Sequence, residues 1–455
     1  MQRRNVLQMF VLLLLALLYV GLTQKYRAYD ADNPWWLSFS YNACHGGGEL
    51  DTFVGVPYPS AMEGVHLFGK MPAGIQCAVF NQAGWMPGSV VCLNLVFGIA
   101  SLWMWWSFLR RLGYRENWIA VFILMLGVTE PVVAMMEKAR YEFFTFFLLS
   151  LALWLGVQGW EFLTVLVALM ATETHPFAIT VPIVVILLLA IRTRNWKMLT
   201  LKVAVSGCLA LAFYFHLHPH ALEVMSRGAH PFNSYVPGGI LYAYFVERRR
   251  HLPELVFLLL GSWLYWKHRS EVRDTPVKWL ALMVGALLFV QPHLNAAYAI
   301  YAMPFFLWVA LEGYDLARKW LWVPGLVLLG ILAQYGYLYK VNLHEGFRRQ
   351  EFAAVQQRIT ESEATLGIAD SQVRLCGDYS LWFAHPQNYK TCQVRWEEKE
   401  LRSADIYLCF DGPLQPNGLS ATEWLSCADT NEMVPLRELS SINLRGHLLH
   451  IETRR

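Results

Sequence analysis

Apolar runs long enough to cross a lipid bilayer recur along this chain. A spanning helix needs about 20 predominantly apolar residues, and lipid tolerates only helices or closed barrels, because every backbone polar group must be paired internally. Hydrophobic residues make up 56% of the chain and charged residues only 16%, which excludes an ordinary soluble enzyme. We predict an α-helical polytopic membrane protein with about 11 transmembrane helices, at residues 5–22, 88–109, 117–135, 143–157, 162–175, 177–191, 199–216, 253–266, 279–296, 299–316 and 320–339.

Basic residues cluster at the ends of the apolar runs and indicate the topology. With the N-terminus in the cytoplasm, the connections 110–111, 192–197, 267–278 and 318–319 all fall on the cytoplasmic side, as the positive-inside rule requires. No Ala-x-Ala cleavage site follows the first run, so we interpret it as an uncleaved helix. The net charge of +3 is too small to indicate nucleic-acid binding.

An odd number of spans leaves two large segments outside the cytoplasm: a first loop at 24–87 and a tail at 340–455. We therefore predict two domains, a membrane domain at 1–339 that includes the first loop and an exported C-terminal α/β domain at 340–455. The alternative is that the tyrosine-rich stretch 238–246 also crosses, which would reverse the topology of everything after it.

Cysteine usage agrees with export. Cys44 and Cys77 lie in the first loop and four more cysteines lie in the tail, which permits one and two disulfides respectively without fixing the tail's pairing. The chain contains no Asn-x-Ser/Thr acceptor site, which favours a bacterial inner membrane over the endoplasmic reticulum.

The tail changes character abruptly. A polar helical stretch at 345–366 precedes short β-like runs at 373–376, 406–410 and 447–451, separated by Gly, Pro and Asp. This pattern predicts a small α/β domain. No glycine-rich Walker loop is present, which argues against an ATP-driven pump.

Two carboxylates, Asp30 and Asp32, follow the first span within reach of the outer membrane surface, and Trp35 and Trp36 suit the interface. Sugar transfer to a hydroxyl needs a carboxylate that takes the acceptor's proton. The alternative is that both are solvated loop acids.

Residues 32–47 (DNPWWLSFSYNACHGG) resemble the opening loop of the GT-C superfamily of polyprenyl-phosphate-dependent membrane glycosyltransferases, which includes protein O-mannosyltransferases and lipid A aminoarabinose transferases. That loop begins with an acidic pair, followed by aromatic residues and a short helix ending in Gly. The resemblance implies a GT-C-like fold and a catalytic role for the first acid. Asp32 matches it, but Asn33 stands where the second acid is usual, so either Asp30 supplies the second carboxylate or one suffices.

Residues 137–142 (EKARYE) are similar to the Arg-x-Glu element of the same superfamily. The resemblance implies that Arg140 faces the donor phosphate, where an arginine fork pairs two oxygens in a way that lysine cannot, and that Glu142 orients it. The alternative for Arg140 is snorkelling to the interface.

Residues 171–176 (ATETHP) divide an apolar stretch into two helices of roughly 22 Å each at about 1.5 Å per residue, both shorter than the hydrocarbon core. Polar backbone at that depth lies beside protein or a wet cavity, so Glu173 and His175 are expected to line the substrate groove. A hairpin cap without a chemical role is the alternative for His175. We predict no metal ligand among these residues, since Glu-x-His alone is weak evidence, and leave open whether a divalent cation assists.

Arg248, Arg249 and Arg250 fall on the outer side, against the positive-inside trend, and suit a donor phosphate or anionic headgroups. If the loop is instead cytoplasmic, the span at 253–266 is wrong.

A late segment, 291–304, resembles a superfamily loop that re-enters a helix through aromatic and proline positions. Ala297 replaces the usual arginine, and donors to phosphate or sugar could then come from His293 and Asn295, with Tyr298 and Tyr301 beside them. Ordinary helix-turn polar residues would look the same.

These residues predict an inverting hexosyl- or pentosyltransferase in which a polyprenyl-phosphate-linked sugar enters from the outer leaflet, Arg140 and Arg248–Arg250 hold its phosphate, and Asp32 deprotonates a lipid, glycan or protein acceptor. The tail, which the resemblance does not cover, would help bind the acceptor. Two alternatives are an oligosaccharide polymerase or ligase with a lipid pyrophosphate donor, and a lipid or sugar transporter. A transporter would need polar residues along a path to both faces, whereas here they gather at the outer ends.

Overall fold

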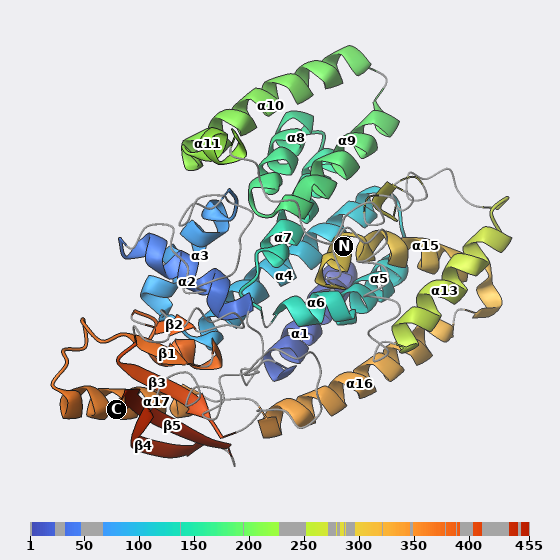
Figure 1. Ribbon diagram of the computed structural model, residues 1–455. Coiled ribbons are helices and arrows are strands. Elements are labelled where there is room, and N and C mark those ends of the chain that lie inside the picture. Colours follow the sequence, from blue (N-terminus) through green and yellow to red (C-terminus); the bar gives the residue numbers. More distant parts are fainter. Residues whose placement is uncertain are drawn as a thin grey trace.

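A computed structural model of the chain (Figure 1) describes residues 2–22, 32–46, 67–136, 138–193, 195–226, 252–271, 279, 283–285, 287, 296–320, 322–345, 349–377, 379–387, 389–391, 404–411, 436–444 and 447–454.

Helices dominate the described residues before the tail. Their bounds are α1 Gln2–Leu22, α2 Asp32–Cys44, α3 Lys70–Ala83, α4 Pro87–Arg111, α5 Glu116–Val128, α6 Glu130–Met136, α7 Glu142–Gln158, α8 Glu161–Met170, η1 Ala171–Glu173, η2 Pro176–Ile179, α9 Thr180–Arg192, α10 Trp196–Leu217, α11 Ala221–Ser226, α13 Leu252–Lys267, η5 Ala296–Tyr301, α15 Met303–Leu316, η6 Arg318–Trp320 and α16 Val323–Glu345.

Three helices of the described part of the chain are long and apolar enough to cross a bilayer: Asn5–Leu22 in α1, α4 and α10. A fourth candidate is the pair α5 and α6, whose axes differ by 57° at their junction. The helices α7 and α9 and most of α16 are apolar but shorter. Each predicted span except 279–296, most of which lies outside the described residues, overlaps a helix or two consecutive helices, and the span predicted at 117–135 is divided between α5 and α6. The count of about 11 membrane-crossing helices is therefore not confirmed.

A single large apolar core joins α1, α4 to α7, α9, α13, α15 and α16. Close helix contact inside it depends on glycine at one crossing, since a Cβ on Gly313 of α15 would lie 2.0 Å from the Gly261 carbonyl oxygen of α13. The exposed sides of α1 and α10 carry large apolar residues, among them Phe10, Leu209 and Leu211, as expected of a lipid-facing surface.

The first loop contributes two helices, α2 and α3, which a disulfide between Cys44 and Cys77 joins across a Cα–Cα distance of 5.8 Å. The single disulfide that the sequence permits in this loop is thus present.

The tail forms α17 (Arg349–Leu366) and a five-stranded mixed sheet of order β2-β1-β3-β5-β4, with β1 Leu375–Gly377, β2 Tyr389–Thr391, β3 Ile406–Phe410, β4 Leu436–Leu444 and β5 His447–Arg454. Strand β1 pairs in parallel with β2 and β3, and β5 pairs antiparallel with β3 and β4. A short 3-10 helix, η7 (Tyr379–Ala384), follows β1. The predicted α/β character of the tail is confirmed.

The sheet and α17 lie beside α2 and α3 (Figure 1), and the tail shares an apolar cluster with these helices and the start of α4. Trp382 of η7 stands edge-on to Tyr41 of α2, with ring centroids 6.2 Å apart. Burial raises the pKa of Tyr41, and the nearby Asp370 carboxylate raises it further. The first loop and the tail therefore occupy the same end of the molecule.

The tail cysteines differ from one another. Cys376 is disulfide-bonded, whereas the Cys409 thiol donates a hydrogen bond of 3.4 Å to the Glu452 carboxylate. The tail therefore holds at most one of the two disulfides that its four cysteines permit.

Candidate active site

The predicted site residues divide into those the structure places and those it does not describe. Asp30, Arg248, Arg249, Arg250, His293 and Asn295 lie outside the described residues. Asp32 is the first residue of α2. The remaining six, Arg140, Glu142, Glu173, His175, Tyr298 and Tyr301, are all buried.

Arg140 is a buried cation in the connection between α6 and α7. It is 6% exposed, its Nε donates to Glu142 Oε1 at 2.8 Å, and its Nη2 donates to the same oxygen. Glu142 is the first residue of α7 and is fully buried. Because a guanidinium out of water needs a charged or hydrogen-bonding partner, this pair fixes the position of the Arg140 head group.

Tyr298 of η5 and His175 complete a cluster around this guanidinium. Arg140 Nη2 donates to the Tyr298 hydroxyl at 3.2 Å, and its Cζ lies 5.6 Å from the ring centroid. His175 Nε2 lies 3.3 Å from the same hydroxyl. His175 Nδ1 accepts a hydrogen bond of 3.2 Å from the Phe177 amide, which places the proton of the neutral imidazole on Nε2. Three connections that are far apart in the chain thus meet at one buried point.

Hydrogen bonds hold these connections in place. Asn94 of α4 donates to the carbonyl oxygens of Met135 and Met136 at 3.1 Å and of Lys138 at 2.7 Å, which fixes the segment that leads to Arg140. Thr174 is hydrogen-bonded through its hydroxyl to that of Thr145 on α7. The turn that carries His175 is therefore anchored on the helix that begins with Glu142.

The helix that begins at Asp32 packs directly on this cluster. Trp36 of α2 lies 4.4 Å from Tyr141 and 6.4 Å from His175 between ring centroids. The Tyr141 hydroxyl is hydrogen-bonded to Ser40 Oγ at 3.0 Å. Since a helix rises about 1.5 Å per residue, the Asp32 backbone lies roughly 6 Å along the α2 axis from Trp36.

Glu173 lies beside the cluster and caps α3. Its Oε1 accepts hydrogen bonds from the Lys70 amide at 2.7 Å and from His218 Nε2 at 3.0 Å, and its Oε2 accepts one from the Met71 amide at 3.2 Å. A carboxylate at a helix N-terminus satisfies amides that have no intrahelical partner. Its bonds to the Lys70 and Met71 amides are thus those of a helix cap.

Glycine is required where α3 begins. Gly69 has a φ of +86°, and a Cβ there would lie 2.4 Å from Tyr141 Cε2. Its amide donates to the Glu173 carbonyl oxygen at 2.7 Å. The same turn therefore brings α3, the Arg140 connection and the His175 turn together.

Tyr301 is fully buried in the main apolar core, three residues after Tyr298. It ends η5, directly before α15. Tyr301 therefore lies in the core close to the cluster, and its place in the substrate groove stays a prediction.

Several residues that shape this site were not predicted from the sequence: Tyr141, Ser40, Asn94, His218, and Gln76, whose Oε1 accepts a hydrogen bond of 2.7 Å from Ser40 Oγ. The polar run at 216–220 (HLHPH), at the end of a predicted span, was a usable signal for His218. Tyr141 stands between Arg140 and Glu142. Asn94 and Gln76 could have been found as isolated polar residues within apolar helices.

The arrangement can bind an anion. A buried guanidinium, a phenol and an imidazole N–H converge from different elements, and donors aimed at developing negative charge act most strongly where water is excluded. Among the described residues, the spacing that a metal ion needs is met by Glu363, Asp370 and His385 of the tail, and not by Glu142, Glu173 and His175.

No protein-family model matches the chain, and comparison with curated protein sequences gave no match. The chain is similar in structure to ArnT from Cupriavidus metallidurans, crystallised with undecaprenyl phosphate, with a TM-score of 0.61 at 11% identity over 98% of this chain and 97% of that one. It is also similar to the oligosaccharyltransferase of Archaeoglobus fulgidus in its apo form, with a TM-score of 0.49 at 12% identity over 84% of this chain and 64% of that one. Over nearly its whole length, the chain therefore has the same fold as ArnT.

Proposed function

We propose that this chain is a membrane glycosyltransferase that moves a sugar from a polyprenyl monophosphate to an acceptor hydroxyl. The observation that carries the proposal is the buried Arg140, held by Glu142 and in hydrogen-bond contact with Tyr298. In the proposed complex the Arg140 guanidinium, the Tyr298 hydroxyl and the His175 imidazole bind the phosphate. Arg248, Arg249 and Arg250 are proposed as further phosphate contacts.

The similarity in fold supports a polyprenyl monophosphate as the sugar donor. The ArnT that this chain resembles was crystallised with undecaprenyl phosphate, and a lipid monophosphate presents the anion that a single arginine fork can bind. His293 and Asn295 are kept as proposed contacts to the sugar or phosphate. The sugar, hexose or pentose, is left to experiment.

The proposed reaction is a single inverting displacement. The acceptor oxygen attacks the anomeric carbon while the bond from that carbon to the phosphate oxygen breaks, and the polyprenyl phosphate leaves with the electron pair. Asp32 accepts the hydroxyl proton, with Asp30 as second carboxylate. The growing charge on the leaving phosphate strengthens its contacts with Arg140, which lowers the barrier.

The site is proposed to face the periplasm of a bacterial inner membrane. The elements around Arg140 are those assigned to the outer side by the basic residues of the opposite loops. The tail, which packs beside α2 at the same end, is proposed to contact the acceptor, whether lipid, glycan or protein.

The test is a pair of measurements on purified full-length protein, with Asp32→Asn as the variant. We expect it to bind undecaprenyl phosphate as the wild type does and to lose transfer from a labelled polyprenyl monophosphate sugar, because the base is gone and the phosphate site remains. Asp315→Asn is the matched control, since Asp315 is exposed in α15, away from the cluster. Full transfer activity in Asp32→Asn would exclude Asp32 as the base.

The lipid product separates the alternatives. Mass spectrometry should find polyprenyl monophosphate after turnover. Release of a pyrophosphate lipid would instead indicate a polymerase or ligase. Movement of labelled lipid across proteoliposomes without covalent transfer would indicate a transporter.

A further inference from the structure

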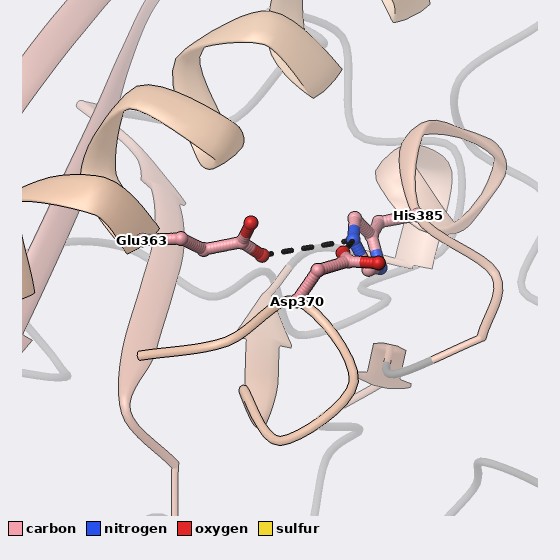
Figure 2. Close-up of side chains that lie close together, drawn as sticks. All are labelled: Glu363, Asp370 and His385. Atoms are coloured by element: carbon pink, nitrogen blue, oxygen red, sulfur yellow. Dashed lines mark hydrogen bonds and ion pairs between the residues drawn. The ribbon is translucent and has the colours of Figure 1, made fainter. Parts of the chain in front are cut away.

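Three side chains of the tail converge on one point, away from the Arg140 cluster (Figure 2). Glu363 lies in the last turn of α17, Asp370 lies in the turn that follows, and His385 follows η7. His385 Nε2 is 2.6 Å from Asp370 Oδ1 and 3.7 Å from Glu363 Oε1. One ligand atom from each of the three lies within 4.8 Å of the others.

Burial of two of these groups points to a missing partner. Glu363 is 3% exposed and His385 is 2% exposed, and Glu363 Oε1 has no hydrogen-bond partner among the described residues. A buried carboxylate oxygen without a partner is costly. Figure 2 shows the Glu363 carboxylate directed at the His385 ring.

We propose that Glu363, Asp370 and His385 bind a divalent transition-metal ion, with Zn²⁺ as the ion that fits this ligand set. An imidazole with two carboxylates suits zinc rather than Mg²⁺ or Ca²⁺, which prefer oxygen ligands alone. Tetrahedral ligands about 2.0–2.2 Å from zinc are separated by roughly 3.3 Å. The two contacts of His385 Nε2, at 2.6 and 3.7 Å, lie on either side of that separation.

The surroundings support metal ligation. Gln387 Nε2 donates to Asp370 Oδ2 at 2.9 Å, an outer contact of the kind that orients a metal-binding carboxylate. His385 Nε2 is the ring nitrogen that faces both carboxylates, so it is the one that would bind the ion, with the ring proton then on Nδ1. The Asp370 side chain is 58% exposed, which leaves an entry path for the ion and room for water as a fourth ligand.

A second histidine of the tail provides the contrast. His450 also lies between two carboxylates, but Asp411 contacts its Nε2 at 2.5 Å and Glu438 contacts its Nδ1 at 3.5 Å. The two nitrogens are on different edges of the ring, so one ion cannot bind both carboxylates and the imidazole. This arrangement is an ion-pair network, and His450 is the matched control.

The expected role of the ion is structural. It would link the end of α17 to the segment after η7, and η7 carries Trp382, which packs against Tyr41 of α2. Bound metal should therefore stabilise the contact between the tail and the first loop.

The test uses the full-length protein, stripped with EDTA and dialysed against ZnCl₂, with bound zinc measured by inductively coupled plasma mass spectrometry. We expect His385→Gln and Asp370→Asn each to bind one zinc per chain fewer than the wild type, and His450→Gln to bind as many. Zinc should raise the Tm of the wild type and of His450→Gln, but not of His385→Gln. Asp370→Asn alters an exposed carboxylate, so it remains informative if the variants at buried positions do not fold.

Two results would overturn the site: wild-type protein that binds no zinc at micromolar concentration, or Asp370→Asn that retains the full wild-type complement. Stronger binding of Ca²⁺ or Mg²⁺ than of Zn²⁺ in the same dialysis would contradict the assignment to a transition metal.

Discussion

Arg140 and Tyr298 are 158 positions apart in the chain, yet the guanidinium of one donates to the hydroxyl of the other at 3.2 Å. The two residues belong to the connection before α7 and to η5, which lie against each other beside the large apolar core. Because both side chains are buried, the contact is held in a low dielectric, where it is stronger than at the surface. A change to either partner should therefore alter donor binding.

Arg140→Lys should reduce transfer about 10²- to 10³-fold, the usual cost of removing one donor from a site that stabilises developing charge. Lysine keeps the positive charge but not the planar fork that bonds Glu142 and a phosphate together. Steady-state kinetics with a polyprenyl monophosphate sugar would measure this loss, and titration with undecaprenyl phosphate should show weaker binding.

The control for that variant is Arg110→Lys. Arg110 also pairs with a glutamate, at 2.7 Å from Glu116, but it lies about 24 Å along α4 from Asn94, at about 1.5 Å per residue. The Arg110→Lys variant should bind undecaprenyl phosphate with the same affinity as the wild type. Equal losses in both variants would point to general damage and not to a phosphate contact.

Tyr298→Phe keeps the ring near Arg140 and removes only the hydroxyl. A net hydrogen bond of about 1 kcal/mol corresponds to roughly a fivefold weaker affinity for undecaprenyl phosphate. Tyr314→Phe is the control, since it removes a buried hydroxyl that donates to the Phe257 carbonyl oxygen at 3.0 Å. It should lower Tm without changing donor affinity, and the reverse pattern in the two variants would exclude Tyr298 from the site.

Much of the helical layout could be predicted because hydropathy acts locally along the chain. The bend between α5 and α6 was not predicted, although Pro131 lies in the first turn of α6, where proline is tolerated because its missing amide would have no intrahelical partner. There the Glu130 amide donates to Glu254 at 3.0 Å, a contact that no local pattern reveals. In the tail, β3 was predicted with its observed bounds. Strand β4 was missed because it is an edge strand whose sequence includes Arg437 and Glu438.

The residues of the cluster could be predicted one by one, and the contact of Glu142 with Arg140 was also expected, but the contacts of Tyr298 with Arg140 and His175 were not. The sequence indicated Arg140, Glu142, His175 and Tyr298 from separate short motifs, and the structure brings them into contact. The capping of α3 by Glu173 joins residues 103 positions apart, and such contacts depend on tertiary packing. The chemical roles of all these residues stay predictions.

Glu173→Gln should lower stability more than it lowers donor affinity. The carboxylate accepts bonds from the Lys70 amide and from His218, and a lost charged acceptor leaves buried donors unsatisfied at about 1–3 kcal/mol. Thermal unfolding followed by tryptophan fluorescence would show the drop in Tm. Glu161→Gln breaks a half-exposed pair with Lys202 and should cost no more than about 1 kcal/mol. If Glu173→Gln lost transfer activity at an unchanged Tm, the result would instead indicate that Glu173 binds substrate.

Asp405→Asn should destabilise the tail in a pH-dependent way. Asp405 precedes β3, and its carboxylate accepts bonds from the Arg374 amide at 3.0 Å and from the guanidinium at 3.1 Å. Burial alone would raise the pKa of Asp405, but the hydrogen bonds and charge of Arg374 outweigh it, so the pKa is lowered. At pH 7 the loss of these bonds should cost about 1–3 kcal/mol.

The sign of the pH dependence follows from that lowered pKa. The stabilisation is fully present above the unfolded-state pKa of about 3.9 and is lost as pH falls through the folded-state value. The Tm difference between wild type and Asp405→Asn should therefore be constant from pH 7 to about 5 and shrink below pH 4. Glu361→Gln, which removes an exposed pair with Arg358, should change Tm little at any pH. A Tm difference for Asp405→Asn that persists undiminished below pH 3 would mean that the Arg374 contact does not depend on the carboxylate charge.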